Sequence, residues 1–253
     1  MIENCKYSRT LGNYPCTCPY VLYGNMCKED CTRVHMTNDF IALFEHGSYV
    51  YGTNNPMSDK DFICIVDDKY SDFLEKFENS IYEYNSERDQ RVIHNINVSE
   101  VDFQYMTKSK FIEMVKENNI MALESIFLPQ KNIVAGNVEQ FAEYFDCNKW
   151  KIRQSFSATA SNSWAKAHKK MTVEKDFDMY RGQKSLFHSL RILMFGNQLC
   201  EYGKIIHFDC ANDYWNDIYY KMKDATWEDY KSKYKPVYNE LRSRLAELAP
   251  KEK

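Results

Sequence analysis

Two continuous apolar runs predict a pair of buried strands. Residues 40–44 read Phe-Ile-Ala-Leu-Phe and stop at His46-Gly47, and residues 62–66 read Phe-Ile-Cys-Ile-Val. Apolar runs of strand length, bounded by turn-forming residues, are typical of strands inside a sheet. Asn and Pro residues at positions 54–56 indicate a turn between the two runs. We therefore expect two neighbouring strands at the centre of a core.

The pattern after these strands changes period twice. Apolar residues recur at helical spacing over residues 72–84, which predicts a helix that covers the sheet. Residues 101–105 alternate apolar and polar side chains, as in a strand with one polar face. Thr107 can then cap a helix, and Pro129 ends the helical stretch that follows. Together these segments predict a strand-rich unit.

The second half of the chain has a mainly helical pattern. Helices are predicted at residues 152–171, 180–195 and 230–248. We accordingly expect three parts in chain order: a small segment at 1–36, a strand-rich domain at 37–137 and a helical domain at 138–253. The predicted fold class is α+β.

Composition and charge narrow the functional classes. The chain has 253 residues, 44% hydrophobic and 15% aromatic, with a formal net charge of −3. These values predict a folded globular protein without a basic nucleic-acid coat, so any polyanion must bind a local patch. No apolar run reaches the ~20 residues that a bilayer requires, and residues 1–10 lack a signal-peptide core. We expect a soluble, cytoplasmic protein without a membrane partner, and its oligomeric state stays open.

The first segment is predicted to bind zinc. Five of the nine cysteines fall within the first 31 residues, a stretch short of aliphatic side chains. A C-x8-C-x3-C-x3-H spacing is formed by Cys18, Cys27, Cys31 and His35. Three thiolates and one imidazole suit a tetrahedral, structural Zn²⁺ ion, which could hold a segment that lacks a hydrophobic core. Cys5 and Cys16 are substitute ligands, and chance clustering of cysteines is the alternative.

The strand-rich domain carries a predicted metal site. Asp59 and Asp61 stand two residues apart at the entry to a strand, so both side chains leave one face, about 6.6 Å apart. Two such carboxylates suit divalent metal, and Asp102 on the third strand is the candidate third ligand for two ions. Gly47-Ser48 forms a tight turn in which backbone N–H groups and the Ser hydroxyl can approach a phosphate.

This combination resembles the DNA polymerase β-like nucleotidyltransferase superfamily, in particular its branch of predicted bacterial and viral nucleotidyltransferases. The first part of the matching pattern consists of Gly47-Ser48, Tyr51-Gly52, Ser58-Asp59, Asp61 and Asp102. The later part consists of Phe111, Asn119, Leu123-Glu124, Phe127 and Pro129. Lys60 departs from the pattern, because the family often has an apolar residue between the two aspartates. The resemblance covers roughly residues 40–130 well and the helical remainder loosely.

The resemblance implies a nucleotidyltransferase palm, a mixed sheet with helices, followed by a mainly helical domain. It also implies transfer of a nucleoside monophosphate from an NTP, such as ATP, to a hydroxyl with release of pyrophosphate. Asp59 and Asp61 would hold two Mg²⁺ ions, and Asp102 would ligate the second ion and help to deprotonate the acceptor. Gly47 and Ser48 would hold the β- and γ-phosphates.

The helical domain offers a second nucleotide-binding candidate. Lys184, His188 and Arg191 share one helix face by spacing. Related enzymes resemble this arrangement in placing basic residues of a helical domain over nucleotide phosphates, and a solvated charged edge is the alternative. His46 and Tyr51 are predicted to pack, and a structural and a functional role are both open for Glu124.

The acceptor is predicted to be an RNA terminus. The run CPYVLYGNMCKEDCTRVH resembles CCCH zinc fingers, which bind single-stranded RNA by stacking bases on aromatic residues. Tyr20, Tyr23 and Gly24 fit that pattern, whereas the short middle gap and Arg33 depart from it. A structural zinc knob is the alternative. Two further functions stay open: an RNA-binding module on a catalytically silent scaffold, and nucleotidylation of a protein or small molecule.

Overall fold

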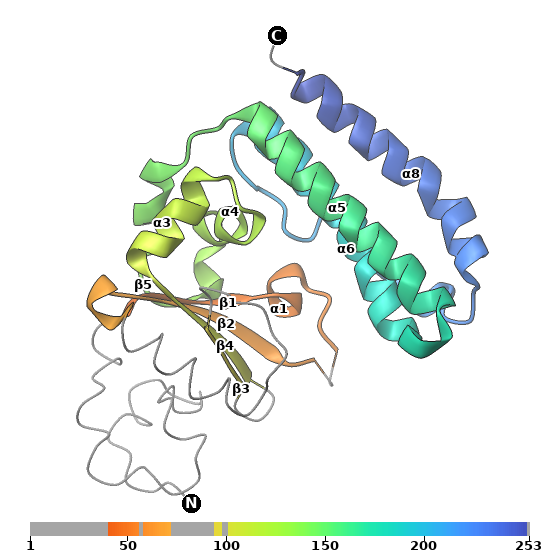
Figure 1. The fold of residues 1–253 in the computed structure, drawn as a ribbon, viewed down its shortest axis with the longest axis horizontal. Helices are drawn as coiled ribbons and strands as arrows, with labels where there is room; N and C mark the ends of the chain where they lie inside the picture. The colour runs from red at the N-terminus through yellow and green to blue at the C-terminus, as the bar shows by residue number, and fades with distance from the viewer. Residues whose placement is uncertain (1–39, 56–57, 72–93, 98–100, 252–253) are drawn as a thin grey trace, which may run out of the picture. The chain divides into compact units, whose positions relative to one another are not determined.

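The computed structural model describes residues 40–55, 58–71, 94–97 and 101–251, which form two compact units (Figure 1). The sheet unit consists of the described residues within Met1–Val50, Asn54–Glu113 and Leu128–Gln140. The helical unit consists of those within Tyr51–Thr53, Met114–Phe127 and Phe141–Lys253. Neither unit is one continuous stretch of chain, because both draw on segments from the middle of the sequence.

A mixed five-stranded sheet forms the sheet unit, in the strand order β3-β4-β2-β1-β5. Its strands are β1 (Phe40–His46), β2 (Lys60–Val66), β3 (His94–Asn97), β4 (Val101–Thr107) and β5 (Ile133–Gly136). The β2–β4 pair is parallel, and the other three neighbouring pairs are antiparallel. The predicted strands at 40–44, 62–66 and 101–105 are confirmed as β1, β2 and β4.

The apolar run Phe62–Val66 of β2 is explained by burial of its side chains on both faces of the sheet. Strands flank it on both sides, and Phe62–Val66 are all buried. β1 contributes the buried Ala42–Phe44 segment, and the ring of Phe44 lies 6.3 Å from that of Phe111 on the helix after β4. The core of this unit therefore lies along β1 and β2.

Short helices connect the strands. α1 (Ser48–Tyr51) follows β1, and η4 (Asp68–Tyr70) follows β2. α3 (Lys108–Lys116), α4 (Ile120–Ile126) and η5 (Gln130–Asn132) lie between β4 and β5, and η6 (Glu139–Tyr144) leads from β5 to α5. Thr107 caps α3 as predicted, because its Oγ1 accepts from the backbone N–H of Lys110 at 3.4 Å. The predicted helix at 72–84 lies outside the described residues.

Three long helices pack side by side in the helical unit: α5 (Lys149–Thr172), α6 (Met179–Tyr202) and α8 (Trp227–Leu248) (Figure 1). Between them come η7 (Glu174–Asp176), α7 (Asn212–Asn216) and the π-helix η8 (Asp217–Lys221). α6 is the central helix, with buried residues along its whole length. This confirms the predicted mixed sheet with helices followed by a helical region.

α6 runs past Phe195, where the sequence predicted its end. Gly196 continues the helix because it lies at a close three-helix contact. A Cβ atom there would lie 3.2 Å from Phe156 on α5 and 3.3 Å from Leu245 on α8. This glycine thus serves packing, and the helix ends at Gly203, whose φ of 71° is left-handed.

Polar side chains start each long helix. Asn148 caps α5, Asp178 caps α6, and Thr226 forms a capping box with Asp229 on α8. Within the described ranges, no helix is both long enough and apolar enough to cross a membrane.

Candidate active site

The turn between β1 and α1 brings a backbone segment against a carboxylate. Gly47 has a φ of 76°, and its carbonyl accepts from the N–H of Val50 at 3.1 Å. A Cβ atom on Gly47 would collide with Oδ2 of Asp61 and lie 3.3 Å from its Cγ. Glycine is therefore required twice, once for the left-handed backbone and once for the close approach of Asp61. Ser48, the next residue, is 5% exposed.

Strand pairing sets a row of three positions across the sheet. On one side, Asp61 is the register partner of His46 in the antiparallel β1–β2 pair. On the other side, Asp61 is the register partner of Asp102 in the parallel β2–β4 pair. Neighbouring strands lie about 4.8 Å apart, so the sheet brings the backbone of Asp102 next to that of Asp61.

Asp59 enters this region from the loop before β2. The loop is closed by two contacts between Asn55 and Ser58: the N–H of Asn55 donates to Ser58 Oγ, and the N–H of Ser58 to the Asn55 carbonyl, both at 2.9 Å. Asp59 is exposed, and Asp61 is half-buried. Lys60 between them places its Nζ 5.4 Å from the centre of the Tyr49 ring.

The described side chains by themselves do not complete a metal site. Among them, no three His, Cys, Asp or Glu residues gather closely enough to hold an ion. The side chain of Asp102 lies outside this description. The predicted zinc ligands Cys18, Cys27, Cys31 and His35 also lie outside the described residues, so the zinc site stays a prediction.

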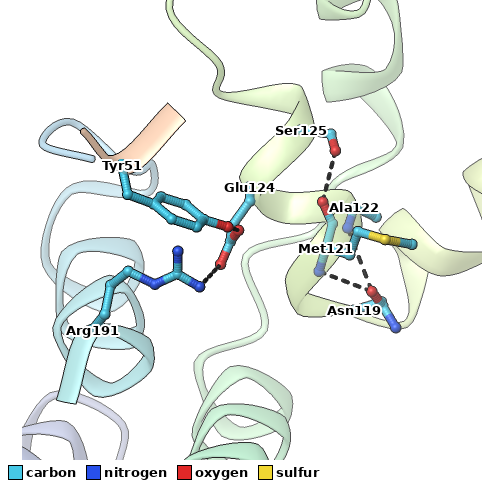
Figure 2. Close-up of polar contacts among 7 residues, drawn as sticks. All are labelled: Tyr51, Asn119, Met121, Ala122, Glu124, Ser125 and Arg191. Atoms are coloured by element: carbon cyan, nitrogen blue, oxygen red, sulfur yellow. Dashed lines mark hydrogen bonds and ion pairs between the residues drawn. The ribbon is translucent and has the colours of Figure 1, made fainter. Parts of the chain in front are cut away.

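The helical unit contains a buried polar cluster of Tyr51, Glu124 and Arg191 (Figure 2). Their side chains are almost fully buried, with Tyr51 and Glu124 3% exposed and Arg191 4%. The Tyr51 hydroxyl donates to Glu124 Oε2, and Arg191 Nη2 donates to Glu124 Oε1 at 3.4 Å. The guanidinium carbon also lies 3.3 Å from the centre of the Tyr51 ring. Both carboxylate oxygens of Glu124 therefore accept a hydrogen bond within this cluster.

The electrostatics of this cluster follow from its burial. Burial raises the pKa of Tyr51 far above its usual value, the Arg191 charge lowers it, and Glu124 raises it further. Tyr51 is therefore a hydrogen-bond donor at all physiological pH values. Arg191 Nε and Nη1 are buried without a hydrogen-bond acceptor among the described residues.

The helix that carries Glu124 begins at a capping asparagine. Asn119 Oδ1 accepts from the backbone N–H groups of Met121 at 3.0 Å and Ala122 at 3.4 Å (Figure 2). Asn118, just before it, takes a positive φ of 56°. This start fixes the direction of α4 and so places Glu124 in the interior.

The three basic residues of α6 differ in their surroundings. Lys184 and His188 are half-buried, with Lys184 Nζ 6.0 Å from the Tyr180 ring and the His188 ring 5.5 Å from that of Phe187. Arg191 instead lies in the interior with Glu124. Helical spacing puts the three residues on one face, but that face passes from half-buried to buried, so it does not form a solvated charged edge.

Sequence reasoning missed two features of these regions. Packing at the strand end stays the prediction for His46, but its pairing with Asp61 in the β1–β2 register was not foreseen. Sequence reasoning also predicted that Tyr51 packs, but it did not predict the hydrogen bond from the Tyr51 hydroxyl to Glu124, 73 residues later in the chain. The signal for His46 was present, because an antiparallel pair joined by a turn puts the end of one strand beside the start of the next.

The cysteines of the described chain are poor nucleophiles. Burial raises the pKa of Cys200 to about 11 and that of Cys210 to about 12. Cys64 is fully buried, and burial raises its pKa as well. Because the thiolate is the reactive form, these residues do not supply the chemistry.

Comparison with known proteins places the chain in a family. A profile described as "RlaP: RNA repair pathway DNA polymerase beta family" matches residues 29–214. Among curated proteins, no sequence matches significantly.

Two solved structures resemble the chain at low identity. One is the spectinomycin adenyltransferase AAD(9) from Enterococcus faecialis with ATP and spectinomycin, at 14% identity and a TM-score of 0.38, covering 83% of this chain and 93% of that one. The other is a nucleotidyltransferase-like protein from Exiguobacterium sibiricum 255-15, at 11% identity and a TM-score of 0.27, covering 86% of this chain and 73% of that one.

The profile match spans most of the chain, from before β1 to the end of α6 and beyond. It includes the Gly47 turn and all three aspartates of the sheet unit. The chain therefore belongs to the RlaP family, the RNA repair pathway DNA polymerase beta family.

Proposed function

We propose that this protein is a metal-dependent nucleotidyltransferase that moves a nucleoside monophosphate from an NTP to a hydroxyl at an RNA terminus. One observation carries the proposal: Asp61 abuts the Gly47 turn and pairs in register with Asp102, with Asp59 two residues before it. The Gly47 turn, to which we assign phosphate binding, and three acidic positions thus lie at one end of β2.

The residues present fit Mg²⁺. Carboxylate oxygens are the ligands that this hard cation prefers, and the exposed Asp59 and half-buried Asp61 are accessible to it. Asp59 and Asp61 would hold both ions, and Asp102 would share the second. When bound, Mg²⁺ supplies charge neutralisation on the triphosphate and lowers the pKa of the acceptor hydroxyl.

The chain's own residues then have distinct roles. The backbone N–H groups of the Gly47-Ser48 turn and the Ser48 hydroxyl hold the β- and γ-phosphates. Asp102 takes the proton of the acceptor hydroxyl, whose oxygen forms a new bond to the α-phosphorus. The bond from the α-phosphorus to the bridging oxygen breaks, and pyrophosphate leaves.

Phosphate contacts from α6 form a separate part of the proposal. Lys184 and His188 are half-buried, so a ligand can reach them. Arg191 has two donors without an acceptor among the described residues, but its charge already faces Glu124. We assign the main α6 contribution to Lys184, which would neutralise charge that develops on the pyrophosphate.

The choice of RNA as acceptor is supported by membership of an RNA repair pathway family. A radiolabel on the α-phosphate tests it directly. The purified chain is incubated with each labelled NTP, Mg²⁺ and an RNA with a 3′-hydroxyl. Parallel incubations contain the same RNA after its 3′ end has been blocked, or cellular protein or small molecules in place of RNA.

We expect label in the open RNA and little in the blocked RNA. Label in protein or in a small molecule would replace the acceptor by one of the other two classes. Absence of transfer from all four NTPs to any acceptor would leave a catalytically silent RNA-binding scaffold.

A further inference from the structure

A row of aromatic rings runs from the interior of the helical unit to its surface. The Trp215 and Tyr219 rings are stacked at 4.9 Å with an interplanar angle of 4°. The Tyr180 ring lies 5.7 Å from that of Tyr219, and the Tyr220 ring lies 4.8 Å from it. Tyr180, Trp215, Tyr219 and Tyr220 therefore form one contiguous aromatic platform.

The platform becomes more exposed toward one end. Trp215 is 4% exposed and packs on Phe187 at 5.3 Å, which anchors the inner end. Tyr180 is 36% exposed and Tyr220 is 61% exposed. Isolated exposed aromatic residues are ordinary, but a contiguous exposed patch marks a binding surface.

The backbone that carries two of these rings is a π-helix. In η8 (Asp217–Lys221) the N–H of Met222 donates to the carbonyl of Asp217 at 2.9 Å, five residues earlier. Such π-turns are rare in proteins, and those that do occur are often found at functional sites. Lys233 forms a salt bridge with Asp217 at 2.6 Å, and the Tyr230 hydroxyl donates to the Ile218 carbonyl at 3.3 Å. Both donors lie on α8, so α8 holds the turn in place.

Cations accompany the rings. Lys184 Nζ lies 6.0 Å from the centre of the Tyr180 ring. Lys221 and Lys223 have side chains 74% and 71% exposed, and their pairs with Asp217 and Asp224 are long, at 4.0 and 3.9 Å. Exposed pairs of this kind contribute little and leave the ammonium groups accessible to another anion.

We infer that the aromatic platform is a stacking site for successive bases of single-stranded RNA, an inference that rests on the proposed function. Rings and ammonium groups together match a ligand with flat faces and regularly spaced phosphates. A single NTP has only one base to stack. Two exposed rings, those of Tyr180 and Tyr220, can stack two bases, which a single strand of RNA provides. The rings would hold the acceptor strand, and Lys221 and Lys223 would contact its phosphates.

The test measures RNA binding without NTP, so that it is independent of catalysis. Fluorescence anisotropy is recorded with a labelled ten-nucleotide oligoadenylate and with a base-free ribose-phosphate strand of the same length. The variants are Tyr220→Leu alone and Tyr180→Leu combined with Tyr220→Leu. The corresponding Tyr→Phe variants keep the rings, and Tyr202→Leu is the matched control, since Tyr202 is 53% exposed at the far end of α6.

We expect the double Leu variant to bind the oligoadenylate at least about 5- to 150-fold more weakly, the range for loss of one stacked base. The Phe and Tyr202→Leu variants should stay within about twofold of the parent. Binding of the base-free strand should not change. Tm values confirm that each variant is folded.

Three results would overturn the inference. One is equal affinity of the parent and the Leu variants for the oligoadenylate. The second is a loss of ATP binding with strand binding intact, which would make the platform a site for the base of the NTP. The third is an effect confined to self-association in sedimentation, which would make it a protein interface. Failure of nucleotide transfer alone affects the proposed function and leaves this result standing.

Discussion

Acidic residues occupy two regions of this chain with opposite surroundings. At the end of β2, Asp59 is exposed and Asp61 is half-buried beside a glycine turn. In the helical unit, Glu124 is 3% exposed and both of its oxygens have partners, Tyr51 and Arg191. A carboxylate of the first kind can bind a metal or a substrate, whereas one of the second kind already binds neighbouring side chains. The stretch that the family profile matches contains Asp59, Asp61 and Glu124, and their different burial separates their roles.

The largest expected effect is on stability, from Glu124→Gln. The change leaves the Arg191 charge buried without its carboxylate, so the free energy of unfolding should fall by about 3–5 kcal/mol. Urea unfolding followed by circular dichroism measures it. Glu201→Gln removes an exposed pair with Arg244 and should change the midpoint little. Similar small changes in the free energy of unfolding of both variants would show that burial of Glu124 does not make it a structural residue.

The next effect is on catalysis, from Gly47→Ala. The added methyl group would displace the Asp61 carboxylate, and a misplacement of about 1 Å can cost about 100-fold in kcat. Gly203→Ala is the matched control, because Gly203 has a similar φ of 71° but no atom within 4 Å of the added methyl. Both variants bear backbone strain, and only Gly47→Ala should lose turnover. Normal kcat in Gly47→Ala would separate Asp61 from the reaction.

The smallest effect is on nucleotide affinity, from Lys184→Ala. Loss of a charged phosphate contact should weaken NTP binding by about 1.5–3 kcal/mol in calorimetric titration at fixed salt. Lys166→Ala, an exposed change on α5, is the comparison. Affinities within twofold for both would reduce α6 to a scaffold. Arg191→Ala tests this less cleanly, because it also leaves Glu124 buried without its cation.

Local pattern was sufficient to predict the central strands and the long helices. β2 could be recognised from the run Phe62–Val66, because a strand whose two faces are both buried has a continuous apolar sequence there. β3 and β5 were missed, since edge strands as short as His-Asn-Ile-Asn and Ile-Val-Ala-Gly carry little periodicity. α6 continues past the predicted end at residue 195, because a close contact with α5 and α8 selects glycine at position 196.

The residues of the candidate site also fall into those with a local sequence signal and those without one. Gly47, Asp59 and Asp61 could be recognised from spacing along one stretch of chain. The pairing of Asp61 with Asp102 depends on strand order, and the pairing of Glu124 with Arg191 joins residues 67 positions apart. Such long-range partners have no local signature, so the role of Arg191 could not be read from its helix face.

Asp59→Asn and Asp61→Asn test the central claim most directly. Each replaces a metal ligand by a side chain of nearly equal volume, so Tm should stay close to that of the parent. Mg²⁺-dependent nucleotide transfer, measured as pyrophosphate release under saturating NTP and RNA, should fall by about 1,000-fold or more. Turnover that stays within a few-fold of the parent in both folded variants would contradict the assignment of the reaction to this end of β2.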